Sequence, residues 1–143
     1  MKKFMNKNNK LNFLKLLLRA SAVLMFLVSF THLFCAEWYH EVVIGLTGVD
    51  FTHGFTAAVT NVVGVLYLGI SAAVWLAASN PIRNKVIIKM LYIINIGLII
   101  VFSYHVVFQG YTSKMLGFVV IITIQLILLT ILYPWKESKI KKY

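Results

Sequence analysis

Four long stretches of the sequence contain almost no charged residues, and they constrain the fold more than any other feature. They run from about Leu16 to Ala36, from Thr56 to Ala78, from Val86 to Val107 and from Met115 to Tyr133. Each is close to the length of about 20 residues that an α-helix needs to cross the hydrocarbon core of a bilayer. We therefore predict an all-α integral membrane protein whose residues 1–143 form a single bundle of four helices, with one long connection at residues 37–55.

The composition supports a membrane environment. Hydrophobic residues make up 60% of the chain and charged residues 13%, whereas soluble domains are about half apolar and about a quarter charged. The net charge of +10 is concentrated near the two ends and in one short hinge, and the basic residues are not interleaved with aromatic residues along one surface. This distribution is typical of anchors beside anionic lipid headgroups, so we predict the lipid bilayer as the partner and no binding of nucleic acid.

The basic residues also predict the orientation of the chain. Thirteen of the fourteen Lys and Arg residues lie in residues 1–19, in residues 83–89 or after residue 135, and only Lys114 lies elsewhere. Because cytoplasmic segments carry an excess of Lys and Arg, both termini are expected in the cytoplasm. A signal-peptide cleavage beside Cys35 would place Phe34 where a small residue is needed, so we expect the first helix to be retained. The abundance of Ile, Lys and Asn is typical of an AT-rich bacterial genome, which predicts an inner (plasma) membrane.

Small and amide residues inside the expected helices indicate how the bundle is held together. Gly69 and Ala73 are four residues apart, a spacing that lets two helices approach closely in lipid. Asn95 and Gln125 fall near the middle of the third and fourth helices, where they can hydrogen-bond to each other for about 1 kcal/mol. No Asp, Glu, Lys or Arg lies near the middle of any stretch, which argues against a proton pump or an ion-coupled transporter.

Residues suited to ligand chemistry are expected together at the outer ends of the helices. Besides the single cysteine, Cys35, this set comprises four histidines and three acids, namely His32, His40, His53, His105, Glu37, Glu41 and Asp50. A carboxylate and a histidine three residues apart share one face of a helix, and this spacing occurs twice, at Glu37–His40 and at Asp50–His53. A di-iron site would need further carboxylates, which leaves one zinc or copper ion as the metal alternative.

Two further interpretations of this set remain open. His32 and His105 lie on different helices at similar depth, as the axial ligands of a haem must. Alternatively, the set is a polar face without any cofactor, since histidine is tolerated at a membrane interface. No Gly-x-Ser-x-Gly or Cys-x-x-Cys motif is present, so we predict no catalytic residue and leave the cofactor unknown.

The first two helices resemble those of DoxX-like small four-helix membrane proteins. The resemblance rests on Leu16-Leu17-Leu18-Arg19, Leu24-Met25-Phe26-Leu27, Ser29 and His32-Leu33-Phe34, and on Asn61, Gly64 and Tyr67-Leu68-Gly69. Ser29 stands where that family has a Gly, and His32 stands in place of a Lys. The resemblance implies a compact four-helix bundle. Members of the family often have no defined activity or serve as accessory subunits of redox enzymes that pass electrons to quinone.

Our first functional prediction is a non-enzymatic accessory or scaffolding subunit of a bacterial inner-membrane complex, with a redox-linked role as one form of it. Its partners would be other membrane subunits or further copies of the chain. The second prediction is a component of a membrane oxidoreductase that holds a metal ion or a haem at the outer face. The third is a small-molecule transporter, which the uncharged interior disfavours.

Overall fold

The computed structural model describes residues 7–48, 50, 53–108 and 114–133, and the described elements are helical. The four long helices are α1 (Lys7–Phe34), α3 (Gly54–Ser79), α4 (Lys85–Phe108) and α5 (Lys114–Leu132). Between α1 and α3 lie the short α2 (Ala36–Trp38) and the π-helix η1 (Tyr39–Ile44). Within the described residues, four helices are long and apolar enough to cross a membrane, so the predicted all-α, multi-pass architecture is confirmed.

The predicted boundaries need two corrections. The first helix begins at Lys7 and not at Leu16, because the basic segment continues the helix and buries Leu14 and Leu18 completely in the core. The long connection begins as helix, since α2 and η1 extend to Ile44 and end at Gly45, which adopts a positive φ of 86°.

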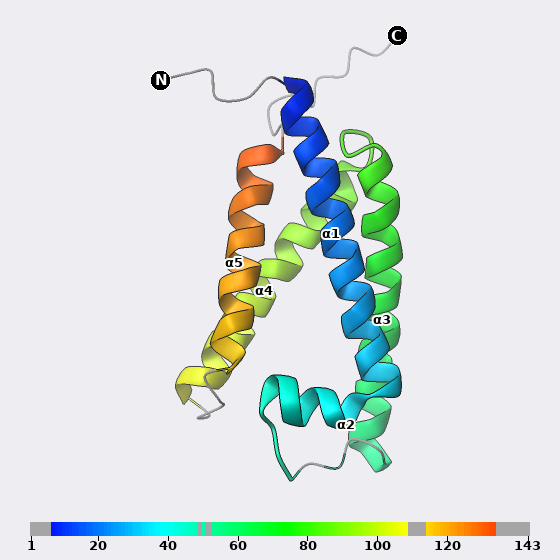
Figure 1. Cartoon of the computed structure of the whole chain (residues 1–143), viewed down its shortest axis with the longest axis vertical. Helices are drawn as coiled ribbons and strands as arrows, with labels where there is room; N and C mark the ends of the chain where they lie inside the picture. The colour runs from blue at the N-terminus through cyan, green and yellow to red at the C-terminus, as the bar shows by residue number, and fades with distance from the viewer. Residues whose placement is uncertain (1–6, 49, 51–52, 109–113, 134–143) are drawn as a thin grey trace.

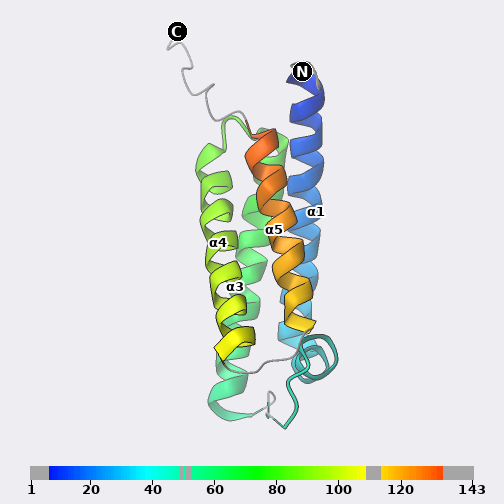
Figure 2. The same cartoon turned by 90° about the vertical axis from the view of Figure 1, so that its left-hand side faces the viewer.

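The four long helices form two pairs. Helix α1 packs mainly against α3, and α4 packs mainly against α5. Figure 1 shows that the pairs lie close together at the end where α1 begins and diverge towards the other end, while Figure 2 shows the four helices running side by side along the long axis. We name the first end the basic end, since it holds Lys10, Lys15, Arg19, Arg83 and Lys85. We name the other the histidine end, after His32, His40, His53 and His105.

All four long helices meet in one core at the basic end. Its buried side chains are Leu14, Leu18, Ala22, Met25, Val74, Ala78, Ile88, Leu91, Leu129 and Tyr133. Towards the histidine end the helix pairs separate, and a second, smaller core forms where η1 contacts α5 through Tyr39, Ile44 and Met115. Lys114 at the start of α5 donates a hydrogen bond of 2.8 Å to the carbonyl of Val42. The segment Ala36–Ile44 thus lies across the histidine end and joins the two pairs (Figure 1).

Two serines link α1 to α3. Ser29 Oγ donates to the carbonyl of Gly64 at 2.7 Å, and Ser71 Oγ donates to the carbonyl of Ala22 at 2.8 Å. At Gly64 the backbones come so close that an added Cβ would lie 2.8 Å from Cγ of Leu33. Small residues and interhelical hydrogen bonds are the usual means of helix association in lipid.

The packing role predicted for Gly69 is therefore wrong. A Cβ added at Gly69 would meet nothing within 4 Å, and Ala73 is only half-buried. The face of α3 that contacts α1 carries Gly64 and Ser71, and Gly69 points away from it. The spacing of small residues correctly indicated that this helix packs closely against a neighbour, but it did not show which small residue faces the neighbouring helix.

Candidate functional site

A cavity of about 110 Å³ lies between the two helix pairs, on the histidine-end side of the main core. Every long helix and η1 contribute to its wall. Most of its lining is apolar, including Met25, Leu98, Phe102, Phe118 and Ile121. At this level α4 and α5 diverge from α1 and α3 (Figure 1), and residues of both pairs line the cavity.

Three polar side chains from different helices lie together in the wall of this interior cavity. Gln125 Nε2 donates a hydrogen bond of 2.7 Å to Ser21 Oγ, and Ser21 in turn donates to the carbonyl of Leu17 at 2.8 Å. Asn95 also lines the cavity and is 1% exposed, but its Nδ2 has no hydrogen-bond partner among the residues that the structure describes. The depth predicted for the two amides holds, whereas the predicted bond between Asn95 and Gln125 does not form, because Gln125 donates to Ser21 on α1 instead.

Tyr39 from η1 and Tyr67 from α3 line the same cavity towards the histidine end. Burial, with a smaller contribution from the nearby Tyr67, raises the pKa of the Tyr39 phenol to about 12. Tyr39 is therefore neutral at physiological pH and remains both a hydrogen-bond donor and an acceptor. Both rings contact His32, with centroid distances of 4.8 Å from Tyr39 and 6.0 Å from Tyr67.

His32 and His40 are oriented by their own helix turns. His32 Nδ1 lies 2.8 Å from the carbonyl of Val28, and His40 Nδ1 lies 2.8 Å from the carbonyl of Ala36. Because a carbonyl oxygen only accepts, Nδ1 carries the hydrogen in both rings, and the neutral ring of His32 keeps its basic lone pair on Nε2. Histidines that bind metals or haem commonly have this arrangement. The two rings meet edge to face at a centroid distance of 5.3 Å.

A second cavity, of about 490 Å³, opens beside these rings at the histidine end. His32, His40 and His105 line it, together with apolar side chains of α3 such as Phe55, Val59 and Val63. The structure therefore brings together three of the four predicted histidines. His32 and His105, the predicted haem pair, share this cavity, and the haem itself stays a prediction.

The remaining predicted ligands are not gathered with these three histidines. His53 and Asp50 pair with each other at 3.5 Å on the surface, where their side chains are 85% and 61% exposed. His53 precedes α3 in an extended conformation, so the helical face assumed for this pair is absent there. Glu37 and Glu41 are exposed. Within the described part of the chain no three His, Cys, Asp or Glu side chains are placed to hold one metal ion, and the mixed zinc or copper site stays a prediction.

Sequence reasoning missed Ser21, Tyr39 and Tyr67 as members of this region. Ser21 and Tyr67 are polar residues within apolar helices, and such residues must find partners in a bilayer. That signal was present in the sequence. Tyr39 carried no equivalent signal, since it was expected in a surface connection and enters the cavity only because η1 lies across the end of the bundle.

The fold and the site together define a class: a multi-pass helical membrane protein with an interior cavity that is apolar except for one polar wall. The sequence matches no protein-family model, no curated protein and no solved structure. The resemblance to DoxX-like proteins accordingly stays a prediction.

Proposed function

We propose that the chain is a non-enzymatic accessory or scaffolding subunit of a complex in a bacterial inner membrane, with both termini in the cytoplasm. We further propose that a transmembrane helix of another subunit docks on the outer surface of the α1–α3 pair. The observation that carries the proposal is a groove in that surface, described next.

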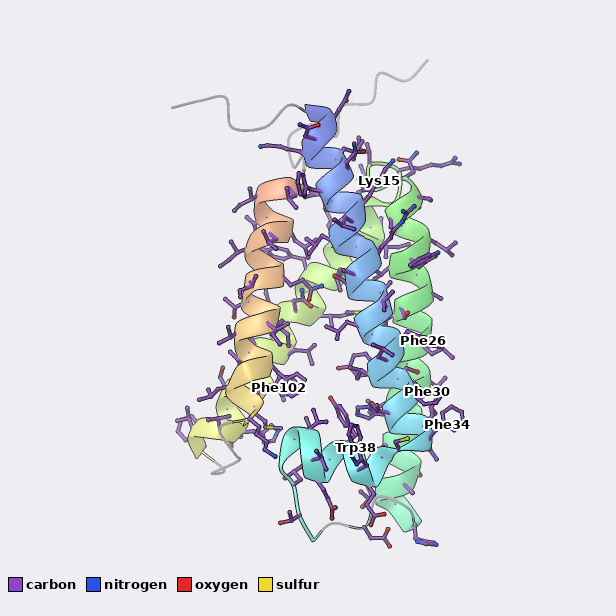
Figure 3. The ribbon with its side chains drawn as sticks, in the orientation of Figure 1. Lys15, Phe26, Phe30, Phe34, Trp38 and Phe102 are labelled. Carbon is purple, nitrogen blue, oxygen red and sulfur yellow. The ribbon has the colours of Figure 1, made fainter. Side chains whose placement is uncertain are left out.

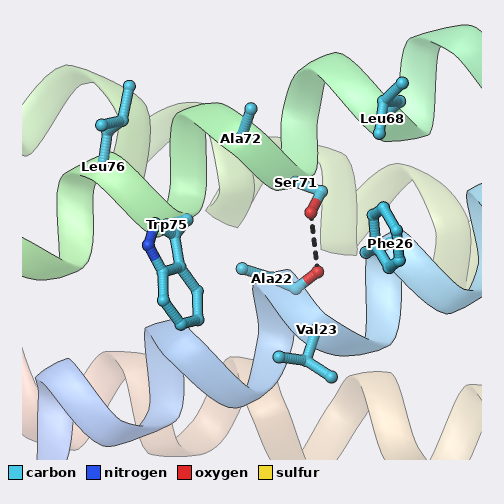
Figure 4. A pocket seen from close by; sticks show the side chains of 8 residues that line it. All are labelled: Ala22, Val23, Phe26, Leu68, Ser71, Ala72, Trp75 and Leu76. Atoms are coloured by element: carbon cyan, nitrogen blue, oxygen red, sulfur yellow. Dashed lines mark hydrogen bonds between the residues drawn. The ribbon is translucent and has the colours of Figure 1, made fainter.

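The groove has a volume of about 500 Å³ and lies between α1 and α3. Figure 4 shows one polar contact in its wall, in which Ser71 donates to the carbonyl of Ala22. Other small residues such as Ala72 leave room between the larger Phe26, Leu68, Trp75 and Leu76. A helix that docks here would therefore meet a surface that is almost entirely apolar.

Three features favour a helix over a lipid chain as the occupant. First, the serine hydrogen bonds and the close contact at Gly64 make the α1–α3 pair the more tightly joined of the two, and a preorganised surface costs less to bind. Second, Phe26, Phe30 and Phe34 continue the exposed face of α1 at intervals of four residues, as Figure 3 shows. Third, the guanidinium of Arg19 lies 5.9 Å from the Trp75 ring, which places a cation at the basic end of the groove.

Photocrosslinking tests the docking surface directly. A benzophenone amino acid is placed at Leu76, at the groove, and in a matched protein at Ile93 on α4, whose exposed fractions of 66% and 70% are similar. We expect one protein adduct of discrete mass from position 76 and none of that mass from position 93. The adduct should disappear in Ala72→Phe, which fills the groove, and persist in Ala58→Phe, which alters another exposed site on α3.

Two outcomes would reject this docking proposal. Adducts of position 76 with phospholipid alone would show that the groove faces bulk lipid. Adducts with a second copy of the chain would show self-association in place of a scaffolding role for another subunit.

Cysteine labelling tests the orientation. Cys35 is the only cysteine and is exposed at the histidine end, so a membrane-impermeant maleimide should label it in intact cells. In a Cys35→Ser background, Arg83→Cys at the basic end should react only after the membrane is opened. The reverse pattern would place both termini outside the cytoplasm.

The histidine-lined cavity favours a second candidate function, a membrane oxidoreductase component that binds haem. His32 Nε2 would supply one axial ligand and His105 the other, and the apolar side chains of α3 would contact the porphyrin. The haem would supply one-electron transfer. Purified protein should then show a Soret band that is lost in His32→Ala and in His105→Ala but retained in His53→Ala. Protein that stays colourless after haem is added would reject this candidate.

A further inference from the structure

We propose that the interior cavity is a binding site for a small, largely apolar molecule that carries a carbonyl-type oxygen, with Asn95 as the residue that recognises the oxygen. This inference goes beyond the proposed scaffolding role and does not depend on it. No residue that lines the cavity also lines the α1–α3 groove.

The unpaired amide specifies the polar part of the ligand. The Asn95 side chain is 1% exposed, lines the cavity, and has an Nδ2 group without a hydrogen-bond partner. A buried donor without a partner destabilises a fold, and the penalty is greatest where water is scarce. An occupant that presents an acceptor oxygen to Nδ2 removes this penalty. A donor-only group, such as an ammonium, does not.

The polar groups on the wall of Asn95 are partly engaged with each other, while Tyr39 and Tyr67 line the cavity further towards the histidine end. Gln125 already donates to Ser21, and Ser21 donates onward to Leu17, so the hydrogens that these bonds use are not available to a ligand. Beyond this wall the lining consists of side chains such as Met25, Leu98 and Phe118. The matching molecule therefore has an acceptor at one end and an apolar body.

The volume limits the size of the apolar body. The cavity measures about 110 Å³, and an engineered apolar cavity of about 150 Å³ in another protein binds benzene. Because the cavity is smaller than that one, the site suits a molecule smaller than benzene, such as a short branched chain. Water is the competing occupant, because one molecule could accept from Asn95 and find a second partner at Gln125, Tyr39 or Tyr67, and the comparison of a ketone with a hydrocarbon of the same shape distinguishes the two occupants.

The test uses two small probes of nearly the same shape, fluoroacetone and 3-fluoro-2-methylpropene, in which a methylene group of the hydrocarbon replaces the carbonyl oxygen of the ketone. Binding to the purified, full-length protein at a fixed detergent concentration is followed by ¹⁹F NMR. Wild-type protein is compared with Asn95→Leu, a change of similar shape that removes the amide. The matched control is Asn61→Leu, which removes an exposed amide from α3.

We expect saturable binding of the ketone to wild-type protein and to Asn61→Leu, and a Kd about three- to tenfold weaker in Asn95→Leu, as the loss of one neutral hydrogen bond predicts. The hydrocarbon should bind wild-type and Asn95→Leu protein equally. A measurement without any variant complements this comparison: the ketone, and not the hydrocarbon, should shift the side-chain amide resonances of Asn95.

Three results would overturn the proposal. If neither probe saturates, the cavity is closed or filled by water. If Asn95→Leu weakens both probes equally, the amide does not recognise the oxygen. If the ketone leaves the Asn95 amide resonances unmoved while it binds, it binds elsewhere.

Discussion

Replacing Gly64 by Ala should destabilise the bundle more than any other single-methyl addition on α3. The new Cβ would lie 2.8 Å from Cγ and 2.9 Å from Cδ2 of Leu33, and 3.2 Å from Cβ of His32. Cγ and Cδ2 of Leu33 move only if that side chain takes another rotamer, whereas Cβ of His32 is fixed by the backbone of α1, so either Leu33 repacks or the two helices separate.

The size of the effect follows from two terms. An extra methyl group in a well-packed interface costs about 1–3 kcal/mol. Separation of α1 from α3 also lengthens the 2.7 Å bond from Ser29 to the Gly64 carbonyl, and such bonds in membrane proteins contribute about 0.6 kcal/mol on average. We therefore expect a loss of about 2 kcal/mol in the free energy of unfolding, which is about a 30-fold change in the folding equilibrium.

The assay is equilibrium unfolding in mixed micelles with increasing SDS, followed by circular dichroism. Gly69→Ala is the matched control on the same helix, since a Cβ there meets nothing within 4 Å, and it should change the free energy of unfolding by less than about 0.5 kcal/mol, as surface substitutions usually do. Equal destabilisation by the two substitutions would refute the assigned contact face of α3.

Three further predictions test contacts elsewhere. Ser71→Ala should lower the free energy of unfolding by about 0.6–1 kcal/mol, because it removes the hydrogen bond to Ala22. The control Ser79→Ala should have no effect, since Ser79 bonds within its own helix turn. Equal losses would argue against an interhelical role of Ser71. Lys114→Met should speed amide hydrogen exchange in Tyr39–Ile44 because the bond to Val42 is lost, and unchanged exchange would show that Lys114 does not hold η1 in place. Asp50→Asn should leave thermal stability unchanged at low and high salt, because its partner His53 is 85% exposed. A large loss of thermal stability would mean that the connection before α3 is more buried than the structure shows.

The candidate site shows how far sequence reasoning reaches in a membrane bundle. Asn95 and Gln125 were expected at one level of the bundle, and they line one cavity, because the level of a residue follows from its position along the helix. Their partners were not predictable, because a partner depends on how each helix is rotated about its axis. The same limit explains why His32, His40 and His105 were assigned to one end but only the fold brought them to one cavity.

The sequence by itself determined that the protein is helical and has four helices long and apolar enough to cross a membrane, since uncharged runs of this length have no other stable arrangement in lipid. Only the tertiary structure decided that Gly64 and not Gly69 contacts α1, that Gln125 pairs with Ser21, and that Asn95 faces a cavity. The physical reason is the solvent. In water, an apolar stripe marks the face of a helix that turns inward, but in lipid both the inner and the outer faces are apolar. The rotation of each helix about its axis is therefore set by a few small and polar contacts, which appear only when the helices are packed together.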